Sequence, residues 1–493
     1  MTRTTTLSLS LVFLAGCGSV GGALYERSLA PSADRVAASE PQSSEEYTHH
    51  GVRDFVDPAQ DPLSTFSVDV DTGSYTVARR KLREGMLPPP AAVRVEEFVN
   101  YFRQDYPDPA GDDVFAIHTQ TMHSPWRPGK VVLQVGLQTR RIDAASRKPA
   151  NLVFLVDVSG SMSSPDKLGL LKQSLEILTR SLRPDDTVAI ATYAGSVDTV
   201  LAPTRVAERD AILDALDDLE AGGSTAMGSG LELAYRLASE RAHPEVNSRV
   251  IVCSDGDANV GATHHSALLE QIRDYRGRGI TLGTVGFGMG NYRDTLMEQL
   301  ADAGDGSYAY VDGLAEARRL FSEDLIPSLE LVARDAKIQV EFDPARVARY
   351  RLIGYENRAI LDEAFRDEAV DAGEVGAGHT VTALYELELQ GEGQDDLGRV
   401  RVRYEPPAGG EAREQEVAIR GQVLEPQASA GRLRFTAAVA EFAELLRQSP
   451  HAATPWPELL AVCEDGLHTP ADEREHELLD LIRRAARIAR ATQ

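Results

Sequence analysis

The chain of 493 residues carries 51 Lys and Arg against 76 Asp and Glu, which gives a formal net charge of −25. This acidic balance argues against nucleic acid as a partner, because phosphate binding needs clustered Lys and Arg. Hydrophobic residues make up 42% of the chain, enough for ordinary globular cores. The three cysteines exclude a disulfide-stapled scaffold, and no apolar run reaches the roughly 18 residues that span a membrane as a helix.

The first residues have the layout of a secretory signal: a positive amino terminus and then a short apolar stretch at 7–14. The tetrapeptide Leu-Ala-Gly-Cys at 14–17 resembles the lipobox of bacterial lipoproteins. The resemblance implies that residues 1–16 are removed and that Cys17 carries lipid, which anchors the protein to a membrane of the cell envelope. Gly18 in place of Asp favours the outer membrane in a Gram-negative cell. An ordinary signal peptide and a cytosolic start are the alternatives.

Residues 17–60 are rich in Ser, Ala, Pro, Glu and Asp without a periodic apolar pattern, which predicts a flexible tether. From residue 61 a more regular pattern begins, and we assign 61–148 to an N-terminal flanking region. Its expected strands and helices are strands at 64–70, 114–121 and 130–139 and helices at 74–84 and 93–102.

Between residues 149 and 332, short runs rich in Val and Ile alternate with helical segments. Strands that are apolar on both faces and separated by helices predict an α/β domain with a doubly wound, mostly parallel sheet. Its strands are expected at 152–156, 188–193, 250–253, 280–286 and 307–311. Its helices are expected at 167–181, 228–240, 266–278, 292–303 and 314–332.

A β-rich flanking region is predicted at 333–425 and a helical region at 426–493. The expected elements are strands at 336–342, 380–389, 399–404 and 416–423 and helices at 431–447 and 473–490. Because strand-rich segments lie on both sides of the α/β domain, we expect them to pair into one β domain with the α/β domain inserted in it. Strand pairing between residues 110–140 and 335–425 would test this expectation.

The segment that carries chemistry follows the first strand of the α/β domain, where Asp157, Ser159 and Ser161 come directly after an apolar run. Ligands of open α/β sheets bind at the carboxyl ends of the strands. Carboxylate and hydroxyl oxygens are hard donors, which suit Mg²⁺, Mn²⁺ or Ca²⁺ better than zinc. Two further polar residues stand at comparable positions: Thr225, in a Gly-Gly-Ser-Thr loop before a helix, and Asp255, at the end of another apolar strand.

This set resembles the metal-ion-dependent adhesion site of von Willebrand factor type A domains. The resemblance implies that the five residues hold a divalent cation, with Mg²⁺ as the expected ion and Mn²⁺ or Ca²⁺ as alternatives. It also implies an open coordination position that an Asp or Glu of a partner protein fills. Taken singly, each hydroxyl residue fits a helix cap and Asp255 fits a turn, so the assignment depends on the complete set. The five residues are Asp157, Ser159, Ser161, Thr225 and Asp255.

Other segments resemble a bacterial lipoprotein family in which a type A domain lies between characteristic N- and C-terminal flanking regions. The resemblance covers nearly everything from residue 61 onward and attaches no activity to the flanking regions. The segments are 65–75, 94–102, 350–358 and 376–383.

The chain contains no HExxH, GxxxxGK[ST] or GxSxG motif, and the sequence identifies no general base beside the expected ion. We therefore expect a cell-envelope lipoprotein that binds another protein through a divalent cation and is not an enzyme. Two alternatives stay open: an assembly or regulatory factor that works with a AAA-type ATPase and, on weaker grounds, an Mg²⁺-dependent hydrolase.

Overall fold

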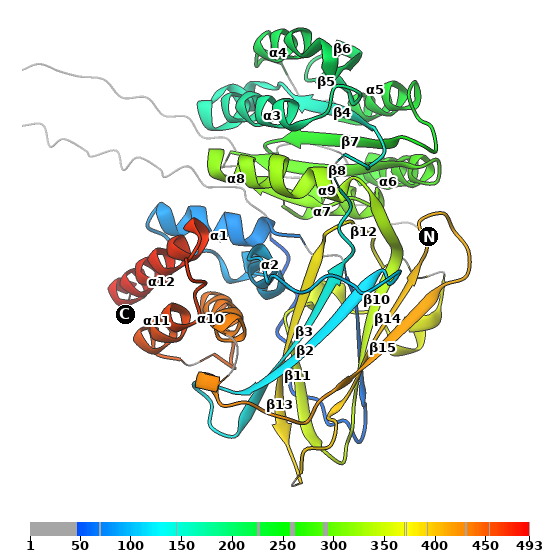
Figure 1. Cartoon of the computed structure of the whole chain (residues 1–493). Helices are drawn as coiled ribbons and strands as arrows, with labels where there is room; N and C mark the ends of the chain where they lie inside the picture. The colour runs from blue at the N-terminus through cyan, green and yellow to red at the C-terminus, as the bar shows by residue number, and fades with distance from the viewer. Residues whose placement is uncertain are drawn as a thin grey trace, which may run out of the picture. The chain divides into compact units, whose positions relative to one another are not determined.

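The computed structural model describes most of the chain from Tyr47 onward (Figure 1). The described residues are 47–68, 71–143, 145–223, 227–256, 262–288, 294–368, 370, 372–391, 393–428, 431–452 and 454–492. The expected signal peptide, the expected lipidation site Cys17 and the expected metal ligand Thr225 lie outside these residues and stay predictions.

The central part of the chain forms the predicted α/β domain (Figure 1). Within the described residues its sheet has the strand order β6-β5-β4-β7-β8-β9, and all neighbours are parallel except β5 and β6. The parallel strands are buried almost throughout, which explains why they are mainly apolar on both faces. The strands are β4 (Ala150–Asp157), β5 (Thr187–Tyr193), β6 (Val197–Arg205), β7 (Asn247–Ser254), β8 (Ile280–Phe287) and β9 (Tyr308–Val311).

Helices cover both faces of this sheet, each face with its own apolar core. One face packs against α3, α4 and α8, and the other packs against α5, α6 and α7. The doubly wound arrangement is therefore confirmed. The helices are α3 (Leu170–Ser181), α4 (Arg209–Asp217), α5 (Met227–Ser239), α6 (Ala262–Arg276), α7 (Asp294–Ala303) and α8 (Leu314–Arg318).

Two parts of the α/β domain differ from the sequence prediction. The edge strand β6 and the helix α4 are not predicted. No residue of β6 is buried, and Asp198, Thr199 and Pro203 interrupt its apolar residues, so β6 lacks the apolar run of the inner strands. The helix expected at 314–332 is broken into α8, a π-helical turn at Arg319–Asp324 and α9 (Leu325–Ser328). The last apolar residues of that range belong instead to strand β10. The sequence there fits either a helix or a strand, and pairing with β12 and β14 makes it a strand.

The flanking regions build two further sheets below the α/β domain in Figure 1. One sheet has the order β1-β10-β14-β15, with β12 also paired to β10, and the other has the order β11-β13-β3-β2. The strands of the first are β1 (Leu63–Ser67), β10 (Leu331–Phe342), β12 (Val375–Gly376), β14 (Gly398–Glu405) and β15 (Arg413–Ile419). The strands of the second are β2 (Phe115–His123), β3 (Lys130–Thr139), β11 (Val347–Ile353) and β13 (Thr380–Leu389).

Each of these sheets joins strands from before and after the α/β domain. In the first, β1 runs antiparallel to β10, with Leu63 opposite Glu341. In the second, β3 runs antiparallel to β13, with Gln138 opposite Thr380. The expectation of one β domain interrupted by the α/β domain is therefore confirmed.

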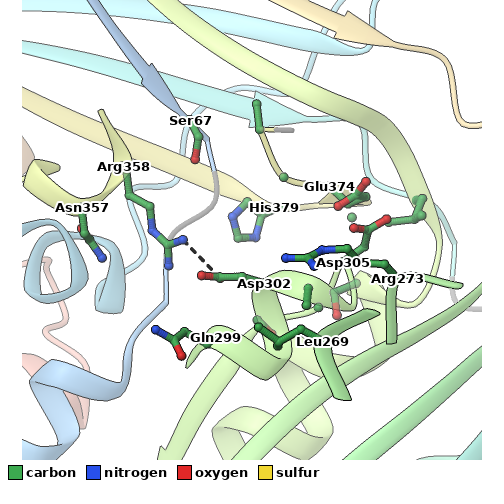
Figure 2. Close-up of a pocket in the computed structure, with 18 of the residues that line it drawn as sticks. Ser67, Leu269, Arg273, Gln299, Asp302, Asp305, Asn357, Arg358, Glu374 and His379 are labelled. Atoms are coloured by element: carbon green, nitrogen blue, oxygen red, sulfur yellow. Dashed lines mark hydrogen bonds and ion pairs between the residues drawn. The ribbon is translucent and has the colours of Figure 1, made fainter. Parts of the chain in front are cut away.

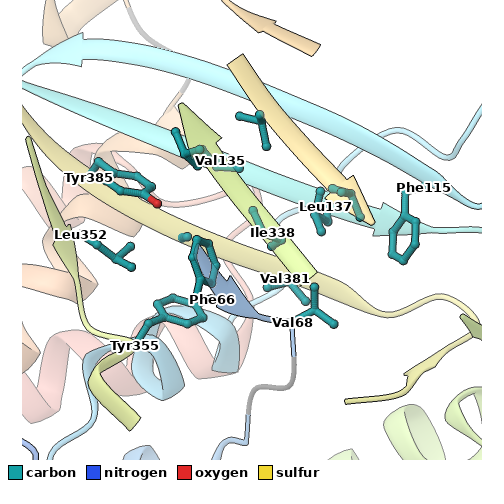
Figure 3. Packing of buried hydrophobic residues seen from close by; sticks show 14 of the residues in the cluster. Phe66, Val68, Phe115, Val135, Leu137, Ile338, Leu352, Tyr355, Val381 and Tyr385 are labelled. Carbon is teal, nitrogen blue, oxygen red and sulfur yellow. The ribbon is translucent and has the colours of Figure 1, made fainter. Parts of the chain in front are cut away.

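The core of the β domain lies between its two sheets (Figure 3). Phe66 of β1 and Ile338 of β10 come from one sheet, and Leu137 of β3 and Tyr385 of β13 come from the other. All four side chains are essentially buried. Side chains from the two inner faces thus fill one apolar layer, as in other sandwiches of packed sheets.

Helices from both ends of the chain pack together on the β11-β13-β3-β2 sheet and share one apolar core. Phe98 of α2 contacts Phe442 of α10 with ring centroids 6.2 Å apart. The helix α11 is the one member of this group that the sequence does not predict. The helices are α1 (Gly73–Arg83), α2 (Val95–Tyr101), α10 (Gly431–Leu446), α11 (Trp456–Asp465) and α12 (Glu473–Thr492).

The last residues of the predicted tether belong to the folded part. The backbone N–H of Val56 donates to the carbonyl of Tyr350 at 2.8 Å, and the Tyr350 N–H donates back at 3.0 Å. The ring of Phe55 lies 4.0 Å from the Lys130 ammonium, measured to the ring centroid. Phe55 and Val56 stand alone in a polar segment, so they produce no periodic pattern. The folded region therefore begins before residue 60, where the sequence predicts the end of the tether.

The two cysteines of the described residues, Cys253 and Cys463, are both buried free thiols. Among the helices of the described residues, none is both long and apolar enough to cross a membrane.

Candidate metal centre

Asp157 is held at the carboxyl end of β4 by donors from three places. The backbone N–H of Ser159 donates to its Oδ1 at 2.9 Å. The hydroxyls of Tyr193 and Ser254 donate to its Oδ2 at 3.2 and 3.0 Å. Tyr193 ends β5 and Ser254 ends β7, the two strands that flank β4. The carboxyl ends of three adjacent parallel strands therefore fix this one carboxylate.

The electrostatics of Asp157 follow from its position. Burial raises the pKa of the Asp157 carboxyl above its ordinary value, the hydrogen bonds from Ser159 oppose this rise, and the charge of Asp255 adds to it. Burial and the neighbouring Asp157 charge also raise the pKa of the Tyr193 phenol far above its usual range. Tyr193 is therefore a permanent neutral donor to the carboxylate.

The two predicted serines lie together in the loop that follows β4. The hydroxyl oxygens of Ser159 and Ser161 are 2.9 Å apart, within hydrogen-bond distance. Ser159 is buried and Ser161 is half-buried. The structure thus brings three of the five predicted ligands, Asp157 and the two serines, into one loop.

A second loop, which leads toward Thr225, is bonded to this one. The N–H of Gly222 donates to the carbonyl of Val158 at 2.6 Å, and the N–H of Gly160 donates to the carbonyl of Gly223 at 3.2 Å. Gly223 has a φ of +96°, and a Cβ there would lie 2.8 Å from the backbone nitrogen of Gly195. Glycine is therefore required where this loop approaches its neighbour.

The second predicted carboxylate, Asp255, follows β7 and has a side chain that is 1% exposed. Its Oδ2 accepts a hydrogen bond from the Lys167 ammonium at 2.8 Å. Lys167 belongs to a π-helical turn, Pro165–Gly169, that directly precedes α3. The predicted ligands among the described residues are therefore two buried carboxylates and two serine hydroxyls, and a lysine pairs with one of the carboxylates.

Sequence reasoning missed three residues that contact the predicted ligands. Tyr193 and Ser254 are the last residues of the two strands beside β4, so the rule that ligands gather at strand ends would have selected them. Lys167 gave no comparable signal, because it stands at the start of a predicted helix and 88 residues before its partner Asp255.

The donors fit a hard divalent cation. Carboxylate and hydroxyl oxygens are the ligands that Mg²⁺ and Mn²⁺ take, whereas zinc prefers His and Cys. In the described ranges no group of three or more His, Cys, Asp and Glu side chains gathers as a metal site. A site that draws half or more of its donors from Ser and Thr is consistent with that finding.

A larger cavity, of about 560 Å³, lies elsewhere, between the α/β domain and the β domain (Figure 2). Arg358 in its wall pairs with Asp302 at 3.2 Å and with Asp71 at 2.8 Å. None of Asp157, Ser159, Ser161 and Asp255 lines this cavity. The predicted ligands therefore lie at the carboxyl ends of the strands and not in this cavity.

Family models match three consecutive parts of the chain. The model described as von Willebrand factor type A domain matches residues 151–323. A model described as von Willebrand factor matches residues 41–134, and one described as the C-terminal part of the uncharacterized protein YfbK matches residues 327–488.

Individual proteins are also similar to this chain. The chain is 38% identical over 419 residues to the uncharacterized protein YfbK of Escherichia coli (strain K12), over 80% of this chain and 72% of that protein. It is 25% identical over 287 residues to the uncharacterized protein sll0103 of Synechocystis sp., over 57% of this chain and 67% of that protein. A solved von Willebrand factor type A structure from Catenulispora acidiphila is 18% identical, with a TM-score of 0.44, over 71% of this chain and 86% of that one.

Von Willebrand factor type A domains typically mediate protein–protein interactions and often bind a divalent metal. The chain belongs to the YfbK family of bacterial proteins, and its inserted α/β domain is a von Willebrand factor type A domain.

Proposed function

We propose that this protein binds a partner protein through a divalent cation, with Mg²⁺ as the expected ion and Mn²⁺ or Ca²⁺ as alternatives. The ion would be held by Asp157, Ser159, Ser161 and Asp255, with Thr225 as the fifth residue of the set. The observation that carries the proposal is the position of Asp157, whose carboxylate is fixed by three neutral donors beside the Ser159 and Ser161 hydroxyls. Such preorganisation lowers the cost of binding a small ion.

The residues divide into anionic and neutral donors. Two carboxylates supply a charge of −2, and the serine hydroxyls add oxygens without adding charge. When bound, the ion would offer a positive centre that an Asp or Glu of the partner can join. We assign no catalytic step to these residues, because homologous type A domains are mostly interaction modules without enzyme activity.

We propose in addition that the protein is a lipoprotein of the cell envelope, anchored through Cys17, with the outer membrane favoured in a Gram-negative cell. Support comes from the lipobox-like tetrapeptide at 14–17 and from the apolar stretch that precedes it. Labelling cells with a radioactive or clickable fatty acid should mark the wild type and not the Cys17→Ser variant. Equal labelling of both would reject the anchor.

The metal assignment is tested by calorimetry with MgCl₂ and MnCl₂ on the full chain. Asp157→Ala should abolish binding, since it removes an anionic ligand. The exposed Asp210 of α4 offers a matched control, and Asp210→Ala should bind the ion as the wild type does. Metal binding that survives in Asp157→Ala would reject the site.

The partner assignment needs a second comparison. Proximity labelling from the intact lipoprotein should mark a partner that the Asp157→Ala variant and EDTA treatment both fail to mark. Labelling that is the same with and without the cation would argue that the partner uses another surface.

A further inference from the structure

We propose that Lys167 is a built-in cation that neutralises Asp255 in the metal-free protein and is displaced when a divalent cation binds. The inference rests on the proposed metal site and adds a competitor to it. The Lys167 ammonium lies 2.8 Å from Asp255 Oδ2, and the two side chains are 12% and 1% exposed.

Because both side chains are largely buried, this ion pair affects the stability of the metal-free protein. A carboxylate removed from water needs a counter-charge, because an unpaired buried charge is strongly unfavourable. The backbone N–H and the hydroxyls that donate to the neighbouring Asp157 are neutral and bring no counter-charge. Among the described residues, Lys167 places a cation directly against one of these two carboxylates, Asp255.

A divalent cation and the ammonium would compete for the same carboxylate. With both on Asp255, two positive charges would lie a few ångströms apart inside the protein, where water screens their repulsion poorly. Binding of the ion therefore favours departure of the lysine. The measured affinity for the ion is reduced by the free energy that the Lys167–Asp255 pair contributes to the metal-free state.

The aliphatic part of the Lys167 side chain is packed, in addition to the pairing of its ammonium. Gly288, which follows β8, has a φ of +73°, and a Cβ at this position would overlap the aliphatic part of the Lys167 side chain. The Lys167 backbone N–H donates to the carbonyl of Ser164 at 3.1 Å. The bare backbone of Gly288 thus forms one wall of the lysine's position, and the π-helical turn Pro165–Gly169 forms another.

Through Arg80, helix α1 of the N-terminal flanking region contacts the π-helical turn directly and Gly288 by way of Tyr310. The guanidinium of Arg80 donates to the Asp166 carboxylate at 3.3 Å, next to Lys167 in the chain. It also donates at 2.6 Å to the Tyr310 hydroxyl, which in turn donates to the carbonyl of Gly288 at 2.9 Å. Displacement of Lys167 would therefore disturb the two segments that Arg80 of α1 contacts, directly or through Tyr310.

The test is calorimetry with MgCl₂ on the full chain carrying Lys167→Met, which keeps the length of the side chain and removes the charge. We expect the variant to bind Mg²⁺ at least about tenfold more tightly, because one competing unit charge has been removed. Lys172→Met is the matched control, since the Lys172 ammonium donates to the backbone carbonyl of Asp217 and not to the site. Its affinity should equal that of the wild type.

Thermal unfolding gives a second readout that does not depend on metal. In EDTA, Lys167→Met should melt below the wild type, because Asp255 has lost the counter-charge that Lys167 supplies. Added Mg²⁺ should then raise the Tm of the variant more than that of the wild type. Lys167→Gln, which keeps a polar group facing Asp255, serves as a second neutral variant with the same expected direction.

The outcomes separate the two proposals. Equal Mg²⁺ affinity in the wild type and Lys167→Met, together with an unchanged Tm in EDTA, would overturn the role of Lys167 and leave the metal site standing. Absence of Mg²⁺ and Mn²⁺ binding in both proteins would overturn the metal site and the competition together. Binding by Lys167→Met alone would support both.

Discussion

Arg79 of α1 and Asp312, which follows β9, form a buried ion pair that joins the N-terminal flanking region to the inserted domain; each side chain is 3% exposed. The same guanidinium donates to Glu316 of α8 at 2.9 Å and to the Tyr101 hydroxyl at 2.7 Å. Although burial alone would raise it, the charges of Arg319 and Arg79 lower the pKa of Glu316 to about 2. The contact between the two regions thus depends on mutually satisfied buried charges.

Removing one member of this network should be costly. Arg79→Met leaves Asp312 and Glu316 with less counter-charge while both stay buried, and we expect a loss of about 3–5 kcal/mol in the free energy of unfolding. Urea unfolding of the full chain measures this loss. Arg180→Ala is the control, since the exposed Arg180–Glu176 pair within α3 should contribute at most about 0.5 kcal/mol. Similar losses in the two variants would show that the buried network does not carry this contact.

The network also predicts how stability depends on pH. The folded-state pKa of Glu316 lies near 2, below its ordinary value of 4.5, so the group stabilises the fold above pH 4.5. That contribution is lost as the pH falls from 4.5 toward 2. The unfolding free energy of Glu316→Gln should therefore fall less steeply between pH 5 and pH 3 than that of the wild type, by an amount measured with urea titrations at the two pH values. Parallel slopes would contradict the assignment.

Much of the architecture follows from local patterns in the sequence. The apolar runs before Asp157 and Asp255 predict parallel strands with a carboxylate at the carboxyl end of each. The structure places both residues at these strand ends. The insertion is predictable because strand-rich segments stand on both sides of the α/β domain. Strand β11 is not predictable in this way, since Arg351 interrupts its apolar pattern.

The reason for that failure lies in contacts between distant segments. Arg351 is fully buried and pairs at 3.2 Å with Glu386 of β13 and, also at 3.2 Å, with Glu444 of α10. A charge that looks incompatible with a core becomes acceptable only when two carboxylates arrive from other elements. Lys167 is a similar case at the proposed metal site, because its partner Asp255 stands 88 residues away in the chain.

Tyr193 offers a test of how Asp157 is positioned. Tyr193→Phe removes one of the donors to the carboxylate and should weaken Mg²⁺ binding severalfold, with a loss of about 1.5–3 kcal/mol in the free energy of unfolding, as for hydrogen bonds to charged groups. Tyr235→Phe is a matched control in the same domain, because the buried Tyr235 hydroxyl has no hydrogen-bond partner among the described residues. Calorimetry should show wild-type affinity for this control. Unchanged affinity in Tyr193→Phe would show that the remaining donors suffice.

Arg80 tests whether the flanking region acts on the metal site. Arg80→Met removes the donors to Asp166 and Tyr310, which loosens both walls around Lys167, so Mg²⁺ affinity should rise, by less than in Lys167→Met. Arg83→Met, on the same helix, is the control, since Arg83 pairs with Asp312 and Glu477 and not with these walls.

The double variant Arg80→Met with Lys167→Met distinguishes this route from a general loosening of the domain. If Arg80 acts through the position of the lysine, its effect on Mg²⁺ affinity should largely vanish once the lysine is gone. Calorimetry on the four proteins of the cycle measures the coupling. Fully additive effects would place the action of Arg80 elsewhere, and an Arg80→Met affinity equal to that of the wild type would separate α1 from the metal site.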